Sequence, residues 1–221
     1  MASSSRPFFV IESLDAGGGS TQLDLLVQRL KKTHYNPHEY HFPQEDSPTG
    51  QLIYEKYLHD KHRHPLSRRE QALLYIQDFY SRLEEMSAIV EKGKKRDVII
   101  SDRYCTSTMA YQTIGLNGKQ REEMLKWIKW LCWEGHPSLL VPTAVILLDI
   151  PVDLAMHRLE KAGRKKDIFE QRDKLTMTRR SYAKFAREEN WLIVNNVDQQ
   201  GRERTRQDIH EEVWGHISSR V

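Results

Sequence analysis

The sequence predicts an α/β fold with three layers, in which a parallel β-sheet lies between helices. Short apolar runs alternate along the chain with longer segments of helical periodicity, as expected for strands joined by helical crossovers. Within the runs, polar and apolar residues do not alternate, which is typical of strands that helices cover on both faces. At 221 residues, the chain suits one well-buried domain of this class better than two. We therefore expect one domain over residues 1–221, with a short disordered tail at 1–6.

Five segments are predicted to form the strands. Four of them are rich in β-branched and other apolar residues, which favour the pleated backbone of a buried sheet, whereas residues 39–42 are a weaker candidate. In chain order the predicted strands are residues 8–11, 39–42, 98–100, 144–148 and 192–194.

Helical periodicity fills most of the chain between these strands, because apolar residues recur at the spacing of one helix face. Prolines support this division, since they are disfavoured inside helices and central strands. Those that fall between the predicted elements are Pro43, Pro48, Pro65, Pro137, Pro142 and Pro151. The predicted helices cover residues 21–32, about 67–92, about 105–115, 119–134, 152–162, 171–189 and 204–220.

Composition and charge exclude several classes of protein. With 38% hydrophobic and 29% charged residues, the chain resembles ordinary globular proteins, and no apolar run approaches the length of a membrane span. The net charge of +3 is mild, and the basic clusters at 92–96 and 161–166 lack the interleaved aromatics of a nucleic-acid surface. We therefore expect no membrane or nucleic-acid partner. Two cysteines give no disulfide framework, which favours a cytoplasmic location.

A glycine-rich turn follows the first predicted strand and precedes an amphipathic helix. Backbone N–H groups in such a turn, together with the helix N-terminus, bind the phosphates of a nucleotide. The usual signature is Gly-x-x-x-x-Gly-Lys-Ser/Thr, but here Ser13 replaces its first glycine and Gly19 replaces its lysine. A tight turn without a ligand is the alternative. The predicted donor phosphate site comprises Ala16, Gly17, Gly18, Gly19, Ser20 and Thr21.

Polar residues also follow the strand at 98–100. Asp102 could hold Mg²⁺ through water, with the hydroxyl of Ser20 as a further ligand, and Arg103 could bind a phosphate through two hydrogen bonds. The alternative is a structural ion pair at the end of a strand. Because the carboxyl ends of parallel strands share one edge of a sheet, we expect these residues to lie near the glycine-rich turn.

Two groups of histidines, at 34–41 and 59–64, lie in sequence that resembles loops. Neither group has the spacing of known metal ligands, so we expect no metal site there.

Four segments together resemble the thymidylate kinase family, in the same order and at the same spacing up to about residue 195. The third of them is the most specific, because it separates this family from other P-loop kinases. The segments are Glu12-Ser-Leu-Asp15-Ala-Gly-Gly-Gly-Ser20-Thr21-Gln22, Phe42-Pro43, Asp102-Arg103-Tyr104-Cys-Thr-Ser107-Thr-Met-Ala110-Tyr111-Gln112 and Leu148-Asp149-Ile-Pro151.

The resemblance implies a P-loop kinase fold with a five-stranded parallel sheet, a homodimer, and Mg²⁺-dependent transfer of the γ-phosphoryl group of ATP to dTMP. It also implies that Arg103 binds the dTMP phosphate, Asp15 meets the sugar hydroxyl and Tyr75 stacks on the base. From the residues alone, core packing in helices is the favoured explanation of Tyr75, Ser107 and Tyr111. The acceptor site implied by the resemblance comprises Asp15, Phe42, Tyr75, Phe79, Arg103, Ser107, Tyr111 and Gln112.

The basic segment 158–170 corresponds to the lid that closes over ATP in this family. Family members without a cation in the phosphate loop usually carry a catalytic arginine in the lid, and Ala16 leaves this loop without one. Without the resemblance, an exposed charged run at a helix end would be the simpler explanation. The candidate catalytic cations are Arg158, Arg164, Lys165 and Lys166.

The sequence departs from the family at functional positions. Ser13 and Gly19 change the donor side, Glu45 stands where many members place an arginine, and Phe79 stands where an arginine usually reads thymine or its phosphate. The first hypothesis is a thymidylate kinase of reduced activity. The alternatives are a catalytically impaired nucleotide-binding protein that acts as a sensor or scaffold, and a nucleoside monophosphate kinase with a changed acceptor.

Overall fold

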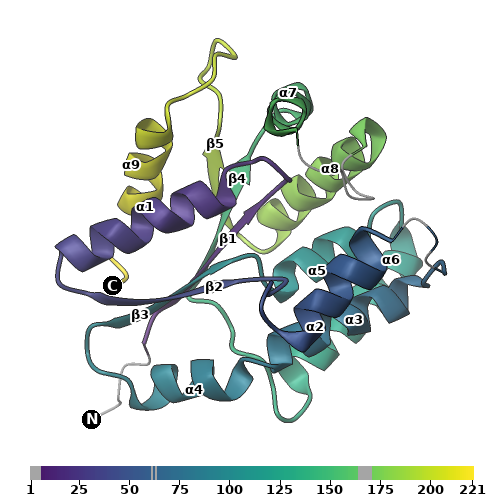
Figure 1. Cartoon of the computed structure of the whole chain (residues 1–221), viewed down its shortest axis with the longest axis horizontal. Coiled ribbons are helices and arrows are strands. Elements are labelled where there is room, and N and C mark those ends of the chain that lie inside the picture. Colours follow the sequence, from purple (N-terminus) through teal and green to yellow (C-terminus); the bar gives the residue numbers. More distant parts are fainter. Residues whose placement is uncertain (1–5, 61, 63, 164–170) are drawn as a thin grey trace.

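The computed structural model describes residues 6–60, 62, 64–163 and 171–221. Five strands form one sheet in the order β2-β3-β1-β4-β5, and all neighbouring strands pair in parallel (Figure 1). They are β1 (Phe8–Ser13), β2 (Asn36–His41), β3 (Asp97–Asp102), β4 (Ala144–Asp149) and β5 (Leu192–Asn195). The predicted five-stranded parallel sheet is confirmed.

Strand β1 lies at the centre of the sheet and explains why its sequence does not alternate. Phe8 and Val10 pack into the core on one face, whereas Phe9 and Ile11 pack into the core on the other. All six residues of β1 are buried. Both faces of a central parallel strand therefore need apolar side chains.

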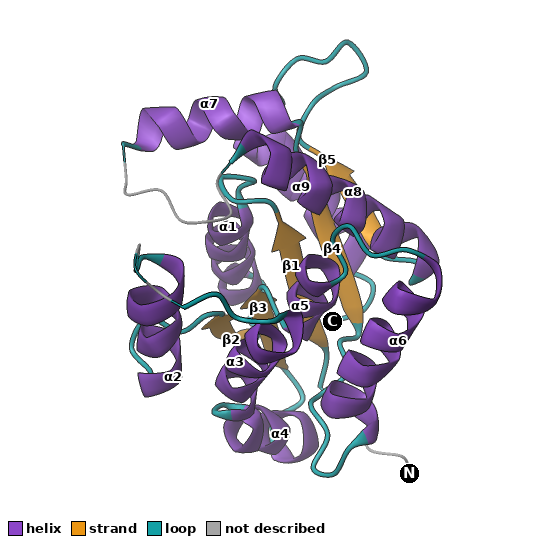
Figure 2. Cartoon of the chain, turned by 90° about the vertical axis from the view of Figure 1, so that its right-hand side faces the viewer, coloured by secondary structure: helices purple, strands orange, loops and turns teal. Residues whose placement is uncertain are grey.

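Helices cover both faces and complete the three layers. Helices α1 and α9 pack on one face, and most of the others pack on the opposite face. Figure 2 shows α1 and α6 on opposite sides of the strands. The helices are α1 (Gly19–Lys32), α2 (Pro48–Gln51), α3 (Arg68–Tyr80), α4 (Leu83–Lys92), α5 (Cys105–Gln112), α6 (Gly118–Lys129), α7 (Val152–Ala162), α8 (Arg172–Glu188) and α9 (Arg206–Ile217), with π-helical turns at η1 (Leu52–Leu58) and η2 (Trp130–Glu134).

Strand β2 was the weakest strand prediction because it lies at an edge of the sheet. Pro37 is tolerated there, since one side of an edge strand has no hydrogen-bonding partner. The expectation of a loop around His38 is wrong, because it belongs to β2, as does His41, which the predicted strand at 39–42 already included. His38 pairs with the carboxylate of Asp97 at 3.2 Å.

The helical regions after β2 differ most from the prediction. The segment predicted as one helix at 67–92 is divided at Ser81 and Arg82 into α3 and α4. The hydroxyl of Ser81 donates to the carbonyl of Asp78 at 2.7 Å and so occupies a carbonyl at the helix end. Helix α2 and the π-helical turn η1 were not predicted. Ser47 caps α2, because its hydroxyl accepts a hydrogen bond from the N–H of Gly50 at 2.9 Å.

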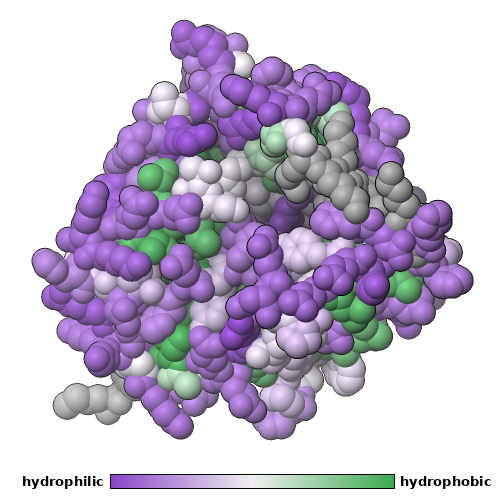
Figure 3. All heavy atoms as spheres, viewed as in Figure 1, coloured by the Kyte–Doolittle hydropathy of each residue, from purple (hydrophilic) through white to green (hydrophobic). Residues whose placement is uncertain are grey.

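The face of the molecule seen in Figure 1 is largely hydrophilic, with hydrophobic atoms in small separate patches (Figure 3). Among the described residues, no helix combines the length and the apolar composition that a membrane span requires.

Candidate functional site

A cavity of about 880 Å³ lies at the carboxyl ends of β1 and its neighbouring strands, the edge at which parallel sheets usually bind ligands. It brings together every described residue that the sequence analysis assigned to the donor, acceptor or metal site, and Arg158. These residues are Asp15, Ala16, Gly17, Gly18, Gly19, Ser20, Thr21, Phe42, Tyr75, Phe79, Asp102, Arg103, Ser107, Tyr111, Gln112 and Arg158. The candidate cations Arg164, Lys165 and Lys166 lie outside the described residues.

The glycine-rich turn connects β1 to α1 and lines this cavity. Ala16 and Gly18 adopt left-handed conformations, with φ of 60° and 98°, respectively. The N–H of Gly17 donates to the carbonyl of Leu14 at 2.8 Å and closes the turn. Helix α1 begins at Gly19, and no described side chain caps it. Free N–H groups and the helix dipole therefore make this end of α1 a site for an anion such as phosphate.

The carboxylate of Asp102 lies against the backbone of Gly19. A Cβ atom at Gly19 would lie 2.4 Å from Oδ1 of Asp102, much closer than an ordinary contact. Oδ2 accepts hydrogen bonds from the hydroxyl of Ser20 at 2.7 Å and from Nδ1 of His41 at 3.2 Å. The first atom of a side chain at Gly19 would thus fall on space that Asp102 already occupies.

Asp102 remains ionised at neutral pH despite its burial. Desolvation alone would raise its pKa, but the hydrogen bond and charge of His41, the charge of Arg103 and the hydrogen bond from Ser20 lower the pKa below its ordinary value. A buried anionic oxygen beside the phosphate loop suits a hard cation better than it suits phosphate.

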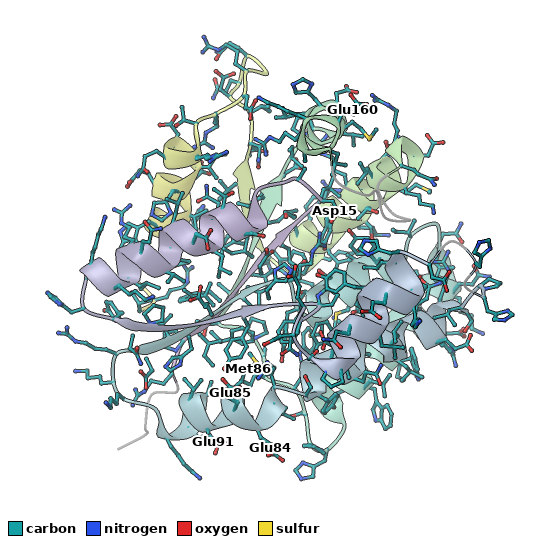
Figure 4. The ribbon with its side chains drawn as sticks, in the orientation of Figure 1. Asp15, Glu84, Glu85, Met86, Glu91 and Glu160 are labelled. Carbon is teal, nitrogen blue, oxygen red and sulfur yellow. The ribbon has the colours of Figure 1, made fainter. Side chains whose placement is uncertain are left out.

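Arg103 spans the acceptor side of the cavity. Its backbone is left-handed, with φ of 66°, and its guanidinium donates to Oδ1 of Asp15 at 2.7 Å and to the hydroxyls of Tyr111 and Tyr182 at 3.4 Å each. Burial opposes its charge, but Tyr111 and Asp15 keep its pKa above the ordinary value. Figure 4 shows Asp15 at the head of β1, far from the acidic side chains of α4. Arg103 thus places a positively charged guanidinium in the lining of the cavity.

Aromatic side chains form the wall of the cavity near α3. Phe79 is only 2% exposed and packs its ring against Phe42 and Tyr104, at centroid distances of 5.0 and 5.3 Å. Tyr75 is partly buried and meets the ring of Tyr57 edge-on at 6.2 Å. Phe79 therefore gives this wall an apolar surface, where an arginine would have offered hydrogen-bond donors.

Arg158 reaches the phosphate loop from α7. Its Nη1 donates to the carbonyl of Ala16 at 2.9 Å and lies 4.0 Å from the position that a Cβ of Gly18 would occupy. Lys161 follows on the same helix and lines the same cavity. Helix α7 thus brings the cations of Arg158 and Lys161 close to a phosphate loop that has no lysine.

Comparisons with known proteins agree with this arrangement. The family model described as thymidylate kinase matches residues 11–209. The chain belongs to the thymidylate kinase family. The Plasmodium falciparum (isolate 3D7) thymidylate kinase is 29% identical over 206 residues, which cover 93% of this chain and 87% of that protein. The thymidylate kinase of Janthinobacterium sp. (strain Marseille) is 31% identical over 189 residues, which cover 82% of this chain and 83% of that protein.

The fold is also that of a solved thymidylate kinase. The structure of the thymidylate kinase from Candida albicans aligns with a TM-score of 0.74 at 20% identity and covers 98% of this chain and 92% of that chain. This likeness, together with the parallel sheet and its flanking helices, confirms the predicted three-layer P-loop kinase fold.

A buried carboxylate with no role predicted from the sequence supports the acceptor side of this site. Glu12 is fully buried and accepts hydrogen bonds from Thr106 and Ser107 at 2.5 Å each and from Tyr182 at 2.8 Å. Burial raises its pKa. Ser107 is therefore engaged with Glu12 as well as lining the cavity. The available signal for this cluster was a charged residue directly after the apolar run 8–11.

A second buried carboxylate holds the loop after β2. Asp78 accepts hydrogen bonds from the N–H of Gln44 at 2.9 Å and from the hydroxyls of Ser47 and Thr49 at 2.9 and 2.5 Å. This network fixes the segment that carries Glu45, an exposed residue at the edge of the cavity. No pattern in the sequence signals it, because Asp78 lies on a helix some thirty residues away along the chain.

Proposed function

We propose that this protein is an ATP-dependent thymidylate kinase, which transfers the γ-phosphoryl group of ATP to dTMP and yields ADP and dTDP. The observation that carries the proposal is the cavity shared by the phosphate loop and Arg103. Membership of the thymidylate kinase family favours the same reaction. The relatives named above are thymidylate kinases, and they give no support to a sensor or scaffold.

On the donor side, we assign the ATP phosphates to the backbone of residues 16–21. Phosphoryl transfer depends on positioning and on neutralising the charge of the moving group. Losing one preorganised donor typically costs ~10²–10³ in rate, so the absent lysine calls for another cation. Arg158 is the described candidate, and we expect Arg164, Lys165 and Lys166 to contribute from the lid.

Mg²⁺ fits the residues at this site. Ser20 and Asp102 offer a hydroxyl and an ionised carboxylate, and Mg²⁺ commonly uses one or two protein oxygens together with substrate phosphates. Among the described residues, no cluster of three or more His, Cys, Asp or Glu could hold a metal alone. When bound, the ion neutralises charge on the β- and γ-phosphates.

On the acceptor side, we assign the dTMP phosphate to Arg103, whose fork of donors suits a phosphate. Asp15, which pairs with this arginine at 2.7 Å, would then accept a hydrogen bond from the sugar hydroxyl. Tyr75 would stack on the base. The remaining acceptor contacts are assigned to Phe42, Phe79, Ser107, Tyr111 and Gln112, which line the same cavity.

A changed acceptor is the second candidate function, because two residues alter the acceptor side. Phe79 is an apolar core residue. Glu45 adds a negative charge at the edge of the cavity. Burial, and secondly this charge, raise the pKa of Tyr54 to about 12. An acceptor that carries less negative charge, or a different base, would suit these residues.

We further propose a homodimer in the cytoplasm. Exposed apolar side chains on the outer helices support an interface, since Leu73 on α3 is 47% exposed and Trp130 on η2 is 52% exposed. Cys105 and Cys132 are both buried and unpaired by disulfide, which fits a reducing compartment.

A coupled assay of ADP release with each common nucleoside monophosphate tests the proposal. We expect kcat/KM to be highest for dTMP, with ATP and Mg²⁺ present. Higher kcat/KM for dUMP or a purine monophosphate would favour the changed acceptor. Turnover no greater than that of Arg103→Ala with every acceptor would reject the kinase function, and tight ATP binding in that case would favour a sensor.

A further inference from the structure

The loop between β5 and α9 is connected to the phosphate loop in two ways. Asn196 is 1% exposed and donates through Nδ2 to the carbonyl of Gly17 at 2.9 Å. Further along the same loop, Glu203 accepts hydrogen bonds from Nη2 and Nε of Arg158 at 2.7 and 3.2 Å. The same guanidinium donates through Nη1 to the carbonyl of Ala16 at 2.9 Å. The loop thus reaches residues 16–17 directly and through Arg158.

We propose that Glu203 is a positioning residue that holds the guanidinium of Arg158 beside the phosphate loop. This inference rests on the proposed kinase function and goes beyond it, because it assigns a catalytic purpose to the loop at 196–204. Without Glu203, the hydrogen bond to the carbonyl of Ala16 is the one that Arg158 keeps among the described residues, and its long side chain regains rotational freedom. A displaced cation stabilises the transferring phosphoryl group less well.

The loop around Glu203 is itself well ordered by hydrogen bonds. Val197 and Glu203 form an antiparallel bridge, and the N–H of Arg204 donates to the carbonyl of Asn196 at 2.9 Å. Asp198 closes the tip by accepting from the N–H of Arg202 at 2.9 Å. Glu203 is therefore presented from a small hairpin whose base is fastened to the phosphate loop.

The alternative is an ordinary surface ion pair that only stabilises the fold. The side chains of Arg158 and Glu203 are 26% and 52% exposed, and exposed pairs usually contribute little to stability. The chain offers a matched control, because Glu211 on α9 is 54% exposed and pairs with Arg29 on α1 at 2.8 Å. Neither Glu211 nor Arg29 lines the cavity.

A double-mutant cycle tests the proposal, with kcat, both KM values and Tm measured for Glu203→Gln, Arg158→Ala, the double variant and Glu211→Gln. Glu203→Gln should lower kcat about tenfold and leave the KM for dTMP unchanged. In the Arg158→Ala background it should have no further effect, because Glu203 acts through Arg158. Glu211→Gln should leave all three kinetic parameters unchanged. Glu203→Asp, which keeps the charge, should give an intermediate loss.

Equal losses of kcat from Glu203→Gln in both backgrounds would overturn the proposal, as would a loss no larger than that of Glu211→Gln. If the unmodified protein shows no transfer to any acceptor, the proposed kinase function fails. The positioning role can then be measured separately as the Kd of a fluorescent ATP analogue through the same cycle. Coupling between Glu203 and Arg158 in that Kd would support positioning, and additivity would reject it.

Discussion

Replacing Gly19 with alanine perturbs the close approach of the phosphate loop to the carboxylate of Asp102. A Cβ atom there would lie 2.4 Å from Oδ1 and 3.1 Å from Cγ of Asp102, whereas ordinary contacts begin near 3.4 Å. The carboxylate would have to retreat by about 1 Å, because such overpacking forces neighbouring groups to shift. Asp102 is only 3% exposed, so that movement disturbs its partners.

The cost follows from the hydrogen bonds that Asp102 accepts from Ser20 at 2.7 Å and His41 at 3.2 Å. Losing one hydrogen bond to a charged group costs about 1.5–3 kcal/mol, and replacing a helical glycine with alanine returns about 0.5–1 kcal/mol. We therefore expect Gly19→Ala to lower the free energy of unfolding by about 1–2 kcal/mol.

Urea denaturation of both variants measures this effect, with Gly215→Ala as the control. Gly215 also lies in a helix, but a Cβ there would meet nothing within 4 Å, so this change should raise the free energy of unfolding by about 0.5–1 kcal/mol. If Gly19→Ala stabilises the protein as Gly215→Ala does, the contact with Asp102 does not constrain the loop and the reasoning is refuted.

Three further predictions concern the acceptor, the absent lysine and pH. Arg103→Ala should lower kcat/KM for dTMP by about 10²-fold or more, with the KM for ATP little changed in steady-state assays. Gly19→Lys should lower kcat rather than raise it, because the new ammonium would displace and pair with Asp102; a gain in kcat would show that the loop lacks only a charge. Burial alone would raise the pKa of Asp97, but hydrogen bonds from Asn36 and His38 lower it. Its contribution to stability is therefore full above the ordinary pKa of a free aspartate and is lost as pH falls through the lowered pKa. Asp97→Asn should accordingly flatten the acid side of a plot of unfolding free energy against pH, and an unchanged slope would contradict this.

The central part of the fold could be predicted from the sequence because its signals are local. Strands such as β1 and β4 are continuous apolar runs, and the amphipathic helices show their periodicity within a single segment. Strand β2 gave a weak signal because an edge strand can keep polar residues and Pro37. The break between α3 and α4 depends on the hydroxyl of Ser81, which periodicity does not detect.

The candidate site could be predicted only where its residues form motifs. Asp15 and Arg103 were expected from the segments that resemble the family, and the structure brings them within 2.7 Å. The contact of Arg158 with Ala16 joins residues 142 positions apart, and that of Tyr182 with Glu12 joins residues 170 apart. Such contacts form only when the chain folds, so spacing along the sequence cannot predict them.

Transfer of labelled phosphoryl from [γ-³²P]ATP to dTMP tests the central claim most directly, when the unmodified protein is compared with Arg158→Ala. Because Arg158 donates to the phosphate loop at Ala16, we predict labelled dTDP from the unmodified protein and a rate lower by about 10²–10³ in the variant. The KM for dTMP should be unchanged. Absence of labelled dTDP, or equal rates for the two proteins, would contradict the account.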